Sequence, residues 1–247
     1  MAEDGRSRQR RAVATRAAII EGAAKEFDER GYFGASMDGV AERAGVTKGA
    51  LYFHFTSKAD LAAAVVARQH EVSRAYAEVA HARGRTPLES MMWMSQGLAV
   101  QMTTETVVSA GIRLSTEPAG NGIDRQDPYT DWMRITADLF REAIAVGEVD
   151  ARWDPALIGR VVSPAYTGVQ TVSDVLAGRS DLFERLRELW TVLLAAFVTE
   201  CTRPEIPRLV AIIAPDAAIA PDAAVVADPD EPDGDAGPPR ATHVTSG

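Results

Sequence analysis

Hydrophobic side chains recur at the three- and four-residue spacing of helices along most of the 247-residue chain, and no pair of segments alternates as paired strands do. Capping residues, prolines and glycines divide this pattern into separate helices. The predicted helices span residues 12–30, 36–44, 47–54, 57–83, 87–104, 106–115, 128–146, 155–177 and 180–202, with a loop at 117–127. We therefore expect an all-α fold in which a small three-helix unit and a long connecting helix precede a C-terminal helical bundle.

Composition divides the chain into four parts. Residues 1–11 form a basic N-terminal arm, residues 12–56 the three-helix unit, and residues 57–203 the larger helical domain. From residue 204 to residue 247 the chain is rich in Ala, Pro and Asp, and we expect this acidic tail to be disordered. Much of the acidity behind the net charge of −9 lies in that tail, so the charge does not exclude nucleic-acid binding at the other end.

Two short helices joined by a glycine carry the strongest motif in the sequence. The segment reads Ser36-Met-Asp-Gly-Val-Ala-Glu-Arg-Ala-Gly-Val-Thr-Lys-Gly-Ala-Leu-Tyr-Phe-His-Phe55, with Gly45 at the turn. This spacing is that of a helix-turn-helix, whose second helix enters the major groove of DNA. Val40, Val46 and Leu51 are expected to form its small core.

The second helix of this motif begins with residues suited to reading DNA. Lys48 at its N-terminus can donate to guanine, and Gly49 and Ala50 keep that face short. Tyr52 and other donors nearby can bind phosphates, although each such residue taken singly also fits a packing or surface role. The candidate DNA-binding residues are Ser36, Thr47, Lys48, Gly49, Ala50, Tyr52, His54 and Lys58, with Arg11 and Arg16 from the basic end.

The basic arm has two interpretations. Five arginines and no acidic residue lie between Gly5 and Arg16. The arm is either a solvated, frayed terminus or an extension that reaches the minor groove or the adjacent phosphates.

The longer helices carry a candidate effector site. Gln69 lies in an apolar stripe of the helix at 57–83, and a polar side chain on a buried face needs a partner. Trp132 and Thr136 lie one turn apart on the inward side of a later helix. This pattern fits an apolar cavity with a few donors and acceptors for a small neutral ligand. The alternative is a solid core in which Gln69 and Thr136 bond to the backbone.

Several of these segments resemble a known family. The ordered segment 36–55, followed by Lys58, closely resembles the TetR family of repressors. Residues 110–117 (AGIRLSTE) and 129–132 (YTDW) resemble the γ-butyrolactone autoregulator receptors, a TetR subfamily of antibiotic-producing actinomycetes. The similarity extends over about residues 10–200 and is weaker after residue 145.

The resemblance implies a ligand pocket lined by Trp132, with polar side chains at matching positions. The candidate ligand-binding residues are Gln69, Trp132, Thr136, Thr167, Met94, Leu98, Leu114 and Phe140. Two features depart from the subfamily: Pro164, which is expected to interrupt or kink the helix at 155–177, and the long acidic tail.

These observations predict a homodimeric transcriptional repressor that binds a palindromic operator in double-stranded DNA and is released by a small γ-butyrolactone-type molecule. The resemblance implies control of antibiotic or other secondary-metabolite genes. The alternative is a TetR-type pseudo-receptor or drug sensor that binds an antibiotic and controls biosynthesis or efflux. A pI near 5.0 favours a true receptor, because pseudo-receptors tend to be basic.

We do not expect an enzyme. The four histidines show no metal-ligand spacing and no partnered nucleophile, and Cys201 is the only cysteine, so neither a metal nor a cofactor is expected. The apolar runs are too short to cross a bilayer and no secretory signal is evident, so we expect a cytoplasmic, nucleoid-associated protein with no membrane partner.

Overall fold

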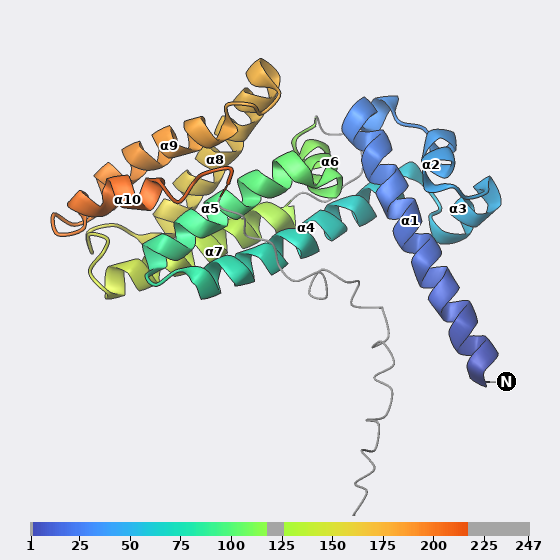
Figure 1. Ribbon diagram of the computed structural model, residues 1–247, viewed down its shortest axis with the longest axis horizontal. Helices are drawn as coiled ribbons and strands as arrows, with labels where there is room; N and C mark the ends of the chain where they lie inside the picture. Colours follow the sequence, from blue (N-terminus) through green and yellow to red (C-terminus); the bar gives the residue numbers. More distant parts are fainter. Residues whose placement is uncertain (1, 118–125, 217–247) are drawn as a thin grey trace, which may run out of the picture.

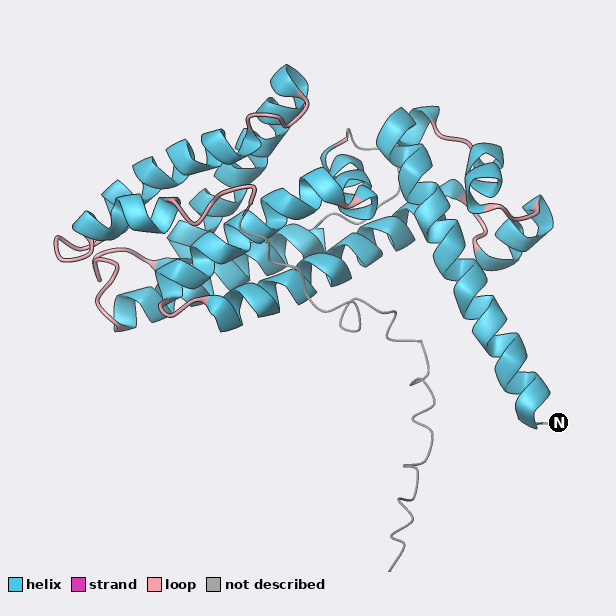
Figure 2. Cartoon of the chain, viewed as in Figure 1, coloured by secondary structure: helices cyan, strands magenta, loops and turns pink. Residues whose placement is uncertain are grey.

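The computed structural model describes residues 2–117 and 126–216, and these residues fold almost entirely into helices (Figures 1 and 2). The helices are α1 (Ala2–Gly34), α2 (Met37–Ala44), α3 (Lys48–His54), α4 (Lys58–Arg83), α5 (Pro87–Thr104), α6 (Thr106–Thr116), α7 (Gln126–Ala145), α8 (Pro155–Ala177), α9 (Leu182–Phe197), the 3₁₀ helix η1 (Arg203–Glu205) and α10 (Ile206–Val210). The predicted all-α fold is confirmed. Most of the predicted loop at 117–127 lies outside the described residues.

The helices form a head and a body (Figure 1). Helices α1, α2 and α3 form the head, and α4 leads from it into the body, where α7 packs on α8 and α8 packs on α9. Helix α6 packs against both α1 and α4, so it joins the two parts. None of the helices in residues 2–117 and 126–216 is long and apolar enough to cross a membrane.

Capping side chains begin the helices where the sequence predicts them. The Ser57 hydroxyl accepts a hydrogen bond from the Asp60 N–H at 3.0 Å, and the Thr86 hydroxyl accepts one from the Glu89 N–H at 3.3 Å. The Glu89 carboxylate accepts from the Arg85 N–H at 2.9 Å, so this motif differs from a regular capping box, in which Glu89 would bind the N–H of the cap residue itself.

Helix α1 is longer than predicted at both ends. It begins at Ala2, so the predicted helix start at residue 12 is wrong, and the basic segment 2–11 is part of the helix. This segment contains no proline and several arginines, which have high helix propensity, so the helix extends without a break. The sequence predicts that the helix ends at residue 30. The Gly31 backbone leaves the helical region (φ 67°), and one further helical turn follows as far as Gly34.

Pro164 does not interrupt α8, contrary to the sequence-based expectation. The helix runs from Pro155 to Ala177 as one element. Pro164 is exposed, so the carbonyl that loses its intrahelical partner lies on the solvent side of the helix.

The first part of the predicted tail is folded. Ile206, Leu209 and Ile213 are buried against the body, and the Arg187 guanidinium donates to the Ile213 carbonyl at 2.9 Å. The prediction of a disordered tail from residue 204 is therefore wrong as far as residue 213. Three apolar residues at helical spacing pack here in spite of the prolines around them. Residues 217–247 lie outside the described part of the chain.

Candidate DNA-binding surface and effector cavity

Helices α2 and α3 form the helix-turn-helix. The Ser36 hydroxyl caps α2 by accepting from the Gly39 N–H at 3.0 Å, and the Thr47 hydroxyl caps α3 by accepting from the Ala50 N–H at 3.2 Å. Gly45 between them has φ 65°, a conformation that favours glycine. Val40 and Leu51 are buried and Val46 packs against them, which is the small core that the sequence predicts.

The start of α3 presents five of the ten predicted DNA-binding residues. Thr47, Lys48, Gly49 and Tyr52 are all exposed, and Ala50 is half-buried. A Cβ at Gly49 would meet no atom closer than 4.0 Å, so the surface there is open. This short face gives the α3 backbone room to approach a groove.

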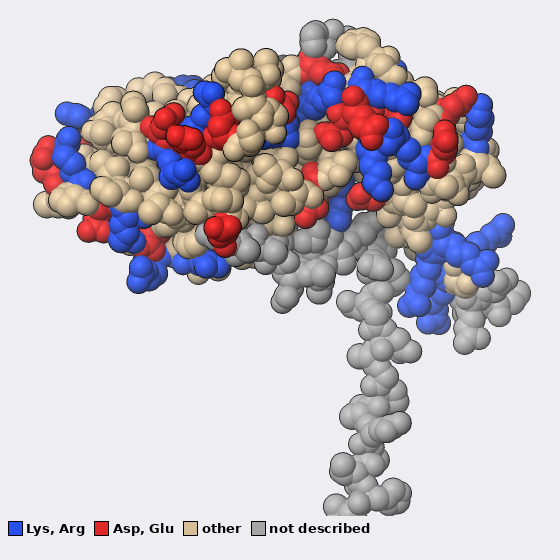
Figure 3. Space-filling model, turned by 45° about the horizontal axis from the view of Figure 1, so that its top comes forward, with Lys and Arg blue, Asp and Glu red and all other residues tan. Residues whose placement is uncertain are grey.

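The end of α1 adds positive charge beside this face. Figure 3 shows Lys and Arg side chains gathered along its N-terminal part, where Arg6, Arg8, Arg10 and Arg11 are exposed. A helical array of arginines is suited to phosphate contacts.

Lys58 and Arg16 have partners within the head, and His54 is partly covered. The Lys58 ammonium donates to the Ala35 carbonyl at 3.0 Å and lies 4.7 Å from the centre of the Tyr32 ring. The Arg16 guanidinium lies 5.3 Å from the centre of the Phe55 ring. His54 is half-buried. These contacts fix α4 and α1 to the motif, and phosphate contacts from the three residues stay predictions.

A buried carboxylate that sequence reasoning missed holds α2 against α1. Glu26 is fully buried, and its carboxylate lies 2.8 Å from the Arg43 guanidinium and accepts from the Ser36 N–H at 3.3 Å. Hydrogen bonding to Arg43 also lowers the pKa of Glu29. Removing one partner of a buried ion pair typically costs about 3–5 kcal/mol, so the orientation of the helix-turn-helix depends on Glu26.

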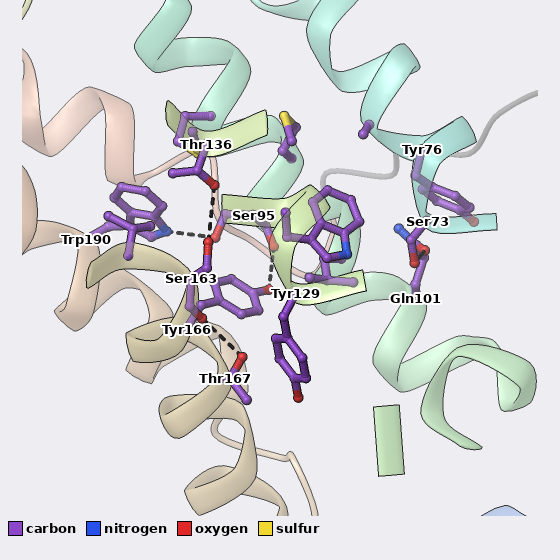
Figure 4. A pocket seen from close by; sticks show the side chains of 16 residues that line it. Ser73, Tyr76, Ser95, Gln101, Tyr129, Thr136, Ser163, Tyr166, Thr167 and Trp190 are labelled. Carbon is purple, nitrogen blue, oxygen red and sulfur yellow. Dashed lines mark hydrogen bonds between the residues drawn. The ribbon is translucent and has the colours of Figure 1, made fainter. Parts of the chain in front are cut away.

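The body contains a partly open cavity of about 110 Å³ (Figure 4). Its walls come from α4, α5, α7, α8 and α9. The lining residues are Ser73, Tyr76, Ala77, Met91, Met94, Ser95, Leu98, Gln101, Tyr129, Trp132, Thr136, Val162, Ser163, Tyr166, Thr167 and Trp190. Five of the predicted ligand-binding residues are among them: Met94, Leu98, Trp132, Thr136 and Thr167.

A second cavity of about 70 Å³ adjoins the first. The side chains common to both walls are Leu98, Tyr129, Trp132, Tyr166 and Thr167. The predicted residue Gln69 lines the second cavity and not the first, together with Gln170 and residues of α5 and α6.

Leu114 and Phe140 line neither cavity, so their assignment as ligand-binding residues does not agree with the structure. Both side chains are fully buried. The Phe140 ring packs edge-on against the ring of Phe197, 5.8 Å away between centres. Leu114 lies on α6, which packs between α1 and α4. Both are core residues, and other side chains pack densely around them.

Hydrogen bonds fix the polar side chains around the cavities. The Gln69 side-chain amide donates to the Ser73 hydroxyl at 3.0 Å, and the Ser73 hydroxyl donates to the side-chain amide oxygen of Gln101 at 2.9 Å. Gln69 therefore bonds to a side chain, not to the backbone as a solid core would require. The Thr136 hydroxyl lies 3.5 Å from that of Ser163 on α8.

A second polar cluster surrounds Ser95 on α5. Its carbonyl accepts from the Tyr166 hydroxyl at 2.9 Å, and its hydroxyl accepts from the Trp190 indole at 2.7 Å. Burial raises the pKa of the Tyr166 hydroxyl, so this group stays a donor. Figure 4 shows these bonds at one end of the cavity.

Several lining residues escaped sequence reasoning, although their spacing gave a signal. Ser163, Tyr166 and Gln170 follow one another at three- and four-residue intervals on the face of α8 that carries the predicted Thr167. Tyr129 lies one turn before Trp132 on α7. Ser163 and Gln170 likewise lie one helical turn from the predicted residue Thr167, so helical spacing indicates these positions.

A helix-turn-helix head and a partly open, mainly apolar cavity, joined by one long helix, define a DNA-binding regulator with a site for a small molecule. Residues 19–65 match the family model of bacterial regulatory proteins of the tetR family, and residues 85–199 match the tetracyclin repressor-like C-terminal domain. The chain belongs to the TetR family of transcriptional regulators. Proteins of this family are DNA-binding regulators and not enzymes, and they bind operator DNA as dimers that respond to small molecules.

Individual relatives agree with this assignment. The chain is 35% identical over 188 residues to the A-factor receptor protein of Streptomyces griseus, a match that covers 76% of this chain and 65% of that protein. The chain thus spans slightly less than two thirds of that relative.

Solved structures match nearly along their whole length. A gamma-butyrolactone receptor (ArpA-like protein) aligns with TM-score 0.67 and 32% identity, covering 82% of this chain and 97% of that one. CprB from Streptomyces coelicolor, solved with its biological operator sequence, aligns with TM-score 0.69 and 33% identity over 82% of this chain and 98% of that one.

Proposed function

We propose that this protein is a dimeric repressor that binds a palindromic operator through α3 and is released by a small γ-butyrolactone-type signalling molecule bound at Trp132. Its target genes on this proposal direct antibiotic or other secondary-metabolite synthesis, and the protein acts on the chromosome in the nucleoid. The resemblance of residues 110–117 and 129–132 to autoregulator receptors supports the ligand class. Similarity to the A-factor receptor protein and to a gamma-butyrolactone receptor supports it further.

The observation that carries the proposal is the course of α4. This helix of 26 residues, about 39 Å long, begins at Lys58 against the head and places Gln69 and Ser73 in the cavity walls. A ligand that separates α4 from α7 and α8 therefore moves an element that is fixed to the DNA-binding unit.

Helix α6 provides a second connection between body and head. The Ser109 hydroxyl donates to the Asp28 carboxylate on α1 at 2.6 Å, and the Arg113 guanidinium donates to the Asp28 carbonyl. The Tyr32 N–H donates to the Glu117 carboxylate at 2.9 Å. The ligand shifts the head only by its difference in affinity between the DNA-bound and the released conformations.

The cavity walls favour an uncharged ligand. None of the described residues that line the two cavities carries a charge, and the larger cavity is lined mainly by apolar and aromatic side chains. A charged effector would lose its hydration there without gaining an ionic partner. A lactone with an alkyl chain presents acceptors and apolar surface, which the hydroxyl donors and apolar walls complement.

An exposed apolar surface on α8 and α9 supports the dimer. Val175, Leu176 and Val192 are each more than two-thirds exposed, and Val161 and Val172 are exposed beside them. Exposed apolar side chains in such number mark interaction surfaces. A twofold axis at this surface would present two α3 helices to half-sites about 34 Å apart.

A mobility-shift assay on the DNA upstream of the protein's own coding region tests the proposal. The purified protein should retard this fragment but not a scrambled one, and a synthetic γ-butyrolactone with an alkyl side chain should restore the free DNA. Antibiotics and their precursors are tested in parallel. Release by an antibiotic but not by the lactone would identify a drug as the effector. Absence of any specific retardation of the DNA would overturn the proposal.

A further inference from the structure

One polar group in the second cavity has no partner. Gln170 lies on α8 and lines this cavity, and its side chain is only 3% exposed. Its amide N–H donates to the Thr171 hydroxyl at 3.1 Å, whereas its carbonyl oxygen accepts no hydrogen bond from any part of the chain that the structure describes.

The neighbouring threonines fix which end of this amide is free. The Thr171 hydroxyl donates its one proton to the Thr167 carbonyl at 2.8 Å, so it can only accept from Gln170. The NH₂ group of the amide must therefore face Thr171. The opposite orientation would place two acceptors against each other, and the oxygen is the atom left over.

A buried acceptor without a donor costs free energy, and a ligand that brings a donor regains it. Most buried polar atoms in folded proteins are paired, so an orphaned carbonyl in a cavity wall points to a missing partner. Trp132 and Tyr129 belong to the walls of both cavities. A molecule in the larger cavity is therefore separated from the Gln170 oxygen by no more than these shared side chains.

We propose that Gln170 is a specificity-determining residue that accepts a hydrogen bond from a hydroxyl or N–H group of the effector. This inference rests on the proposed function and deepens it. The effector is then an amphiphile with two parts, an apolar body in the larger cavity and a donor group in the smaller one. An analogue of the same shape without the donor binds more weakly, since it leaves the Gln170 oxygen unpaired.

Simple probes separate this proposal from the identity of the natural effector. Hexan-1-ol carries a donor, and 1-methoxyhexane carries the same chain and oxygen without one. Binding of each to the full chain without DNA is measured by calorimetry and by tryptophan fluorescence. We expect the wild type to bind the alcohol about tenfold more tightly than the ether, a ratio that corresponds to about 1.4 kcal/mol.

Variants at two neighbouring positions give the controls. Gln170→Met keeps the length of the side chain and should bring the alcohol-to-ether ratio close to one. Thr171→Val removes the acceptor of the Gln170 NH₂ group, so that this group can turn toward the cavity. The affinity for the ether should then rise relative to the affinity for the alcohol. Thr171→Ser retains the hydroxyl and should keep the wild-type ratio. Thr171 is exposed, so both variants at this position should fold.

The outcomes are distinct. A ratio near ten that falls in Gln170→Met and in Thr171→Val but not in Thr171→Ser supports the proposal. A ratio that is equal in all four proteins, or absence of saturable binding of both probes to the wild type, overturns it. Neither result depends on operator DNA or on a lactone, so the repressor function is judged separately by the mobility shift.

Discussion

The Lys48 ammonium lies 2.7 Å from the Asp38 carboxylate, so the residue that is predicted to read the DNA is paired within its own motif. Both side chains are about two-thirds exposed, and an ion pair of this kind contributes little to stability. The pair matters for the predicted role of Lys48, because a contact with a base or a phosphate would replace the contact with Asp38.

Asp38→Asn should therefore weaken discrimination between operator and other DNA. The substitution frees Lys48 and removes a negative charge near the phosphates, so affinity for a scrambled duplex should rise about three- to tenfold and its salt dependence should steepen. Titrations at several salt concentrations measure both quantities. Unchanged affinity for the scrambled duplex would show that the pair has no influence on binding.

Lys48→Ala should weaken operator binding by about 1–3 kcal/mol, which is the range for a good base contact. The loss should be larger on the operator than on a scrambled duplex, since a phosphate contact would weaken both equally. Lys25→Ala is the matched control, because it removes the same charge from an exposed position of α1 outside the helix-turn-helix. Equal losses on both duplexes would identify Lys48 as a phosphate contact.

The head could be predicted from the sequence because short-range contacts determine it. Ser36 and Thr47 bond to residues three positions further along, and Gly45 ends α2 through its own backbone conformation. Each signal is complete within about four residues, which is the range that pattern reading covers. The Glu26–Arg43 pair joins residues 17 apart, and no local rule predicts it.

Trp132→Ala should leave operator affinity within about twofold of the wild type but abolish release by a γ-butyrolactone. The indole belongs to the walls of both cavities, so its removal takes away a surface against which the ligand packs. The mobility shift with increasing lactone measures the effect. Trp153→Ala is the control, since this indole packs on Phe197 and lines neither cavity. Normal release from the Trp132→Ala variant would contradict the cavity assignment.

The cavity was predicted only in part because its residues meet through tertiary packing. Periodicity identified Leu98 and Leu114 alike as inward-facing, yet only Leu98 lies at a cavity. The Tyr166–Ser95 bond joins residues 71 apart, and the orphaned oxygen of Gln170 is evident only when every neighbour is placed. An inward face is a local property, whereas an unfilled space depends on how several helices pack.

Stability should fall on acidification through Glu89. Burial raises the pKa of this carboxyl, but hydrogen bonds from the Arg85 N–H and from the Arg208 and Arg85 guanidinium groups lower it by more, so the pKa in the folded state lies below its ordinary value. A carboxyl with a lowered pKa stabilises the fold at neutral pH, and this contribution is lost as pH falls through the folded pKa. The free energy of unfolding, measured by urea titration between about pH 6 and pH 3, should thus decline less steeply in Glu89→Gln than in the wild type. Parallel pH profiles would exclude this role.

Gly111→Ala should destabilise the protein through the contact of α6 with α4. A Cβ at this position would lie 2.5 Å from Cβ of Gln69 and 2.7 Å from its Cγ. Overpacking of this kind typically costs about 1–3 kcal/mol, because the two helices must move apart. Gly97→Ala in α5 is the matched control: the added methyl meets the Tyr76 ring at 3.7 Å, an ordinary van der Waals contact, so the change should stabilise the helix by about 0.5–1 kcal/mol. Urea unfolding of both variants measures these differences, and the mobility shift reports a second effect. Since α6 also bonds to Asp28 in the head, the displaced helix of Gly111→Ala should weaken operator affinity, whereas Gly97→Ala should leave it unchanged. Destabilisation with unaltered operator affinity would mean that α6 supports the fold without transmitting its position to the head.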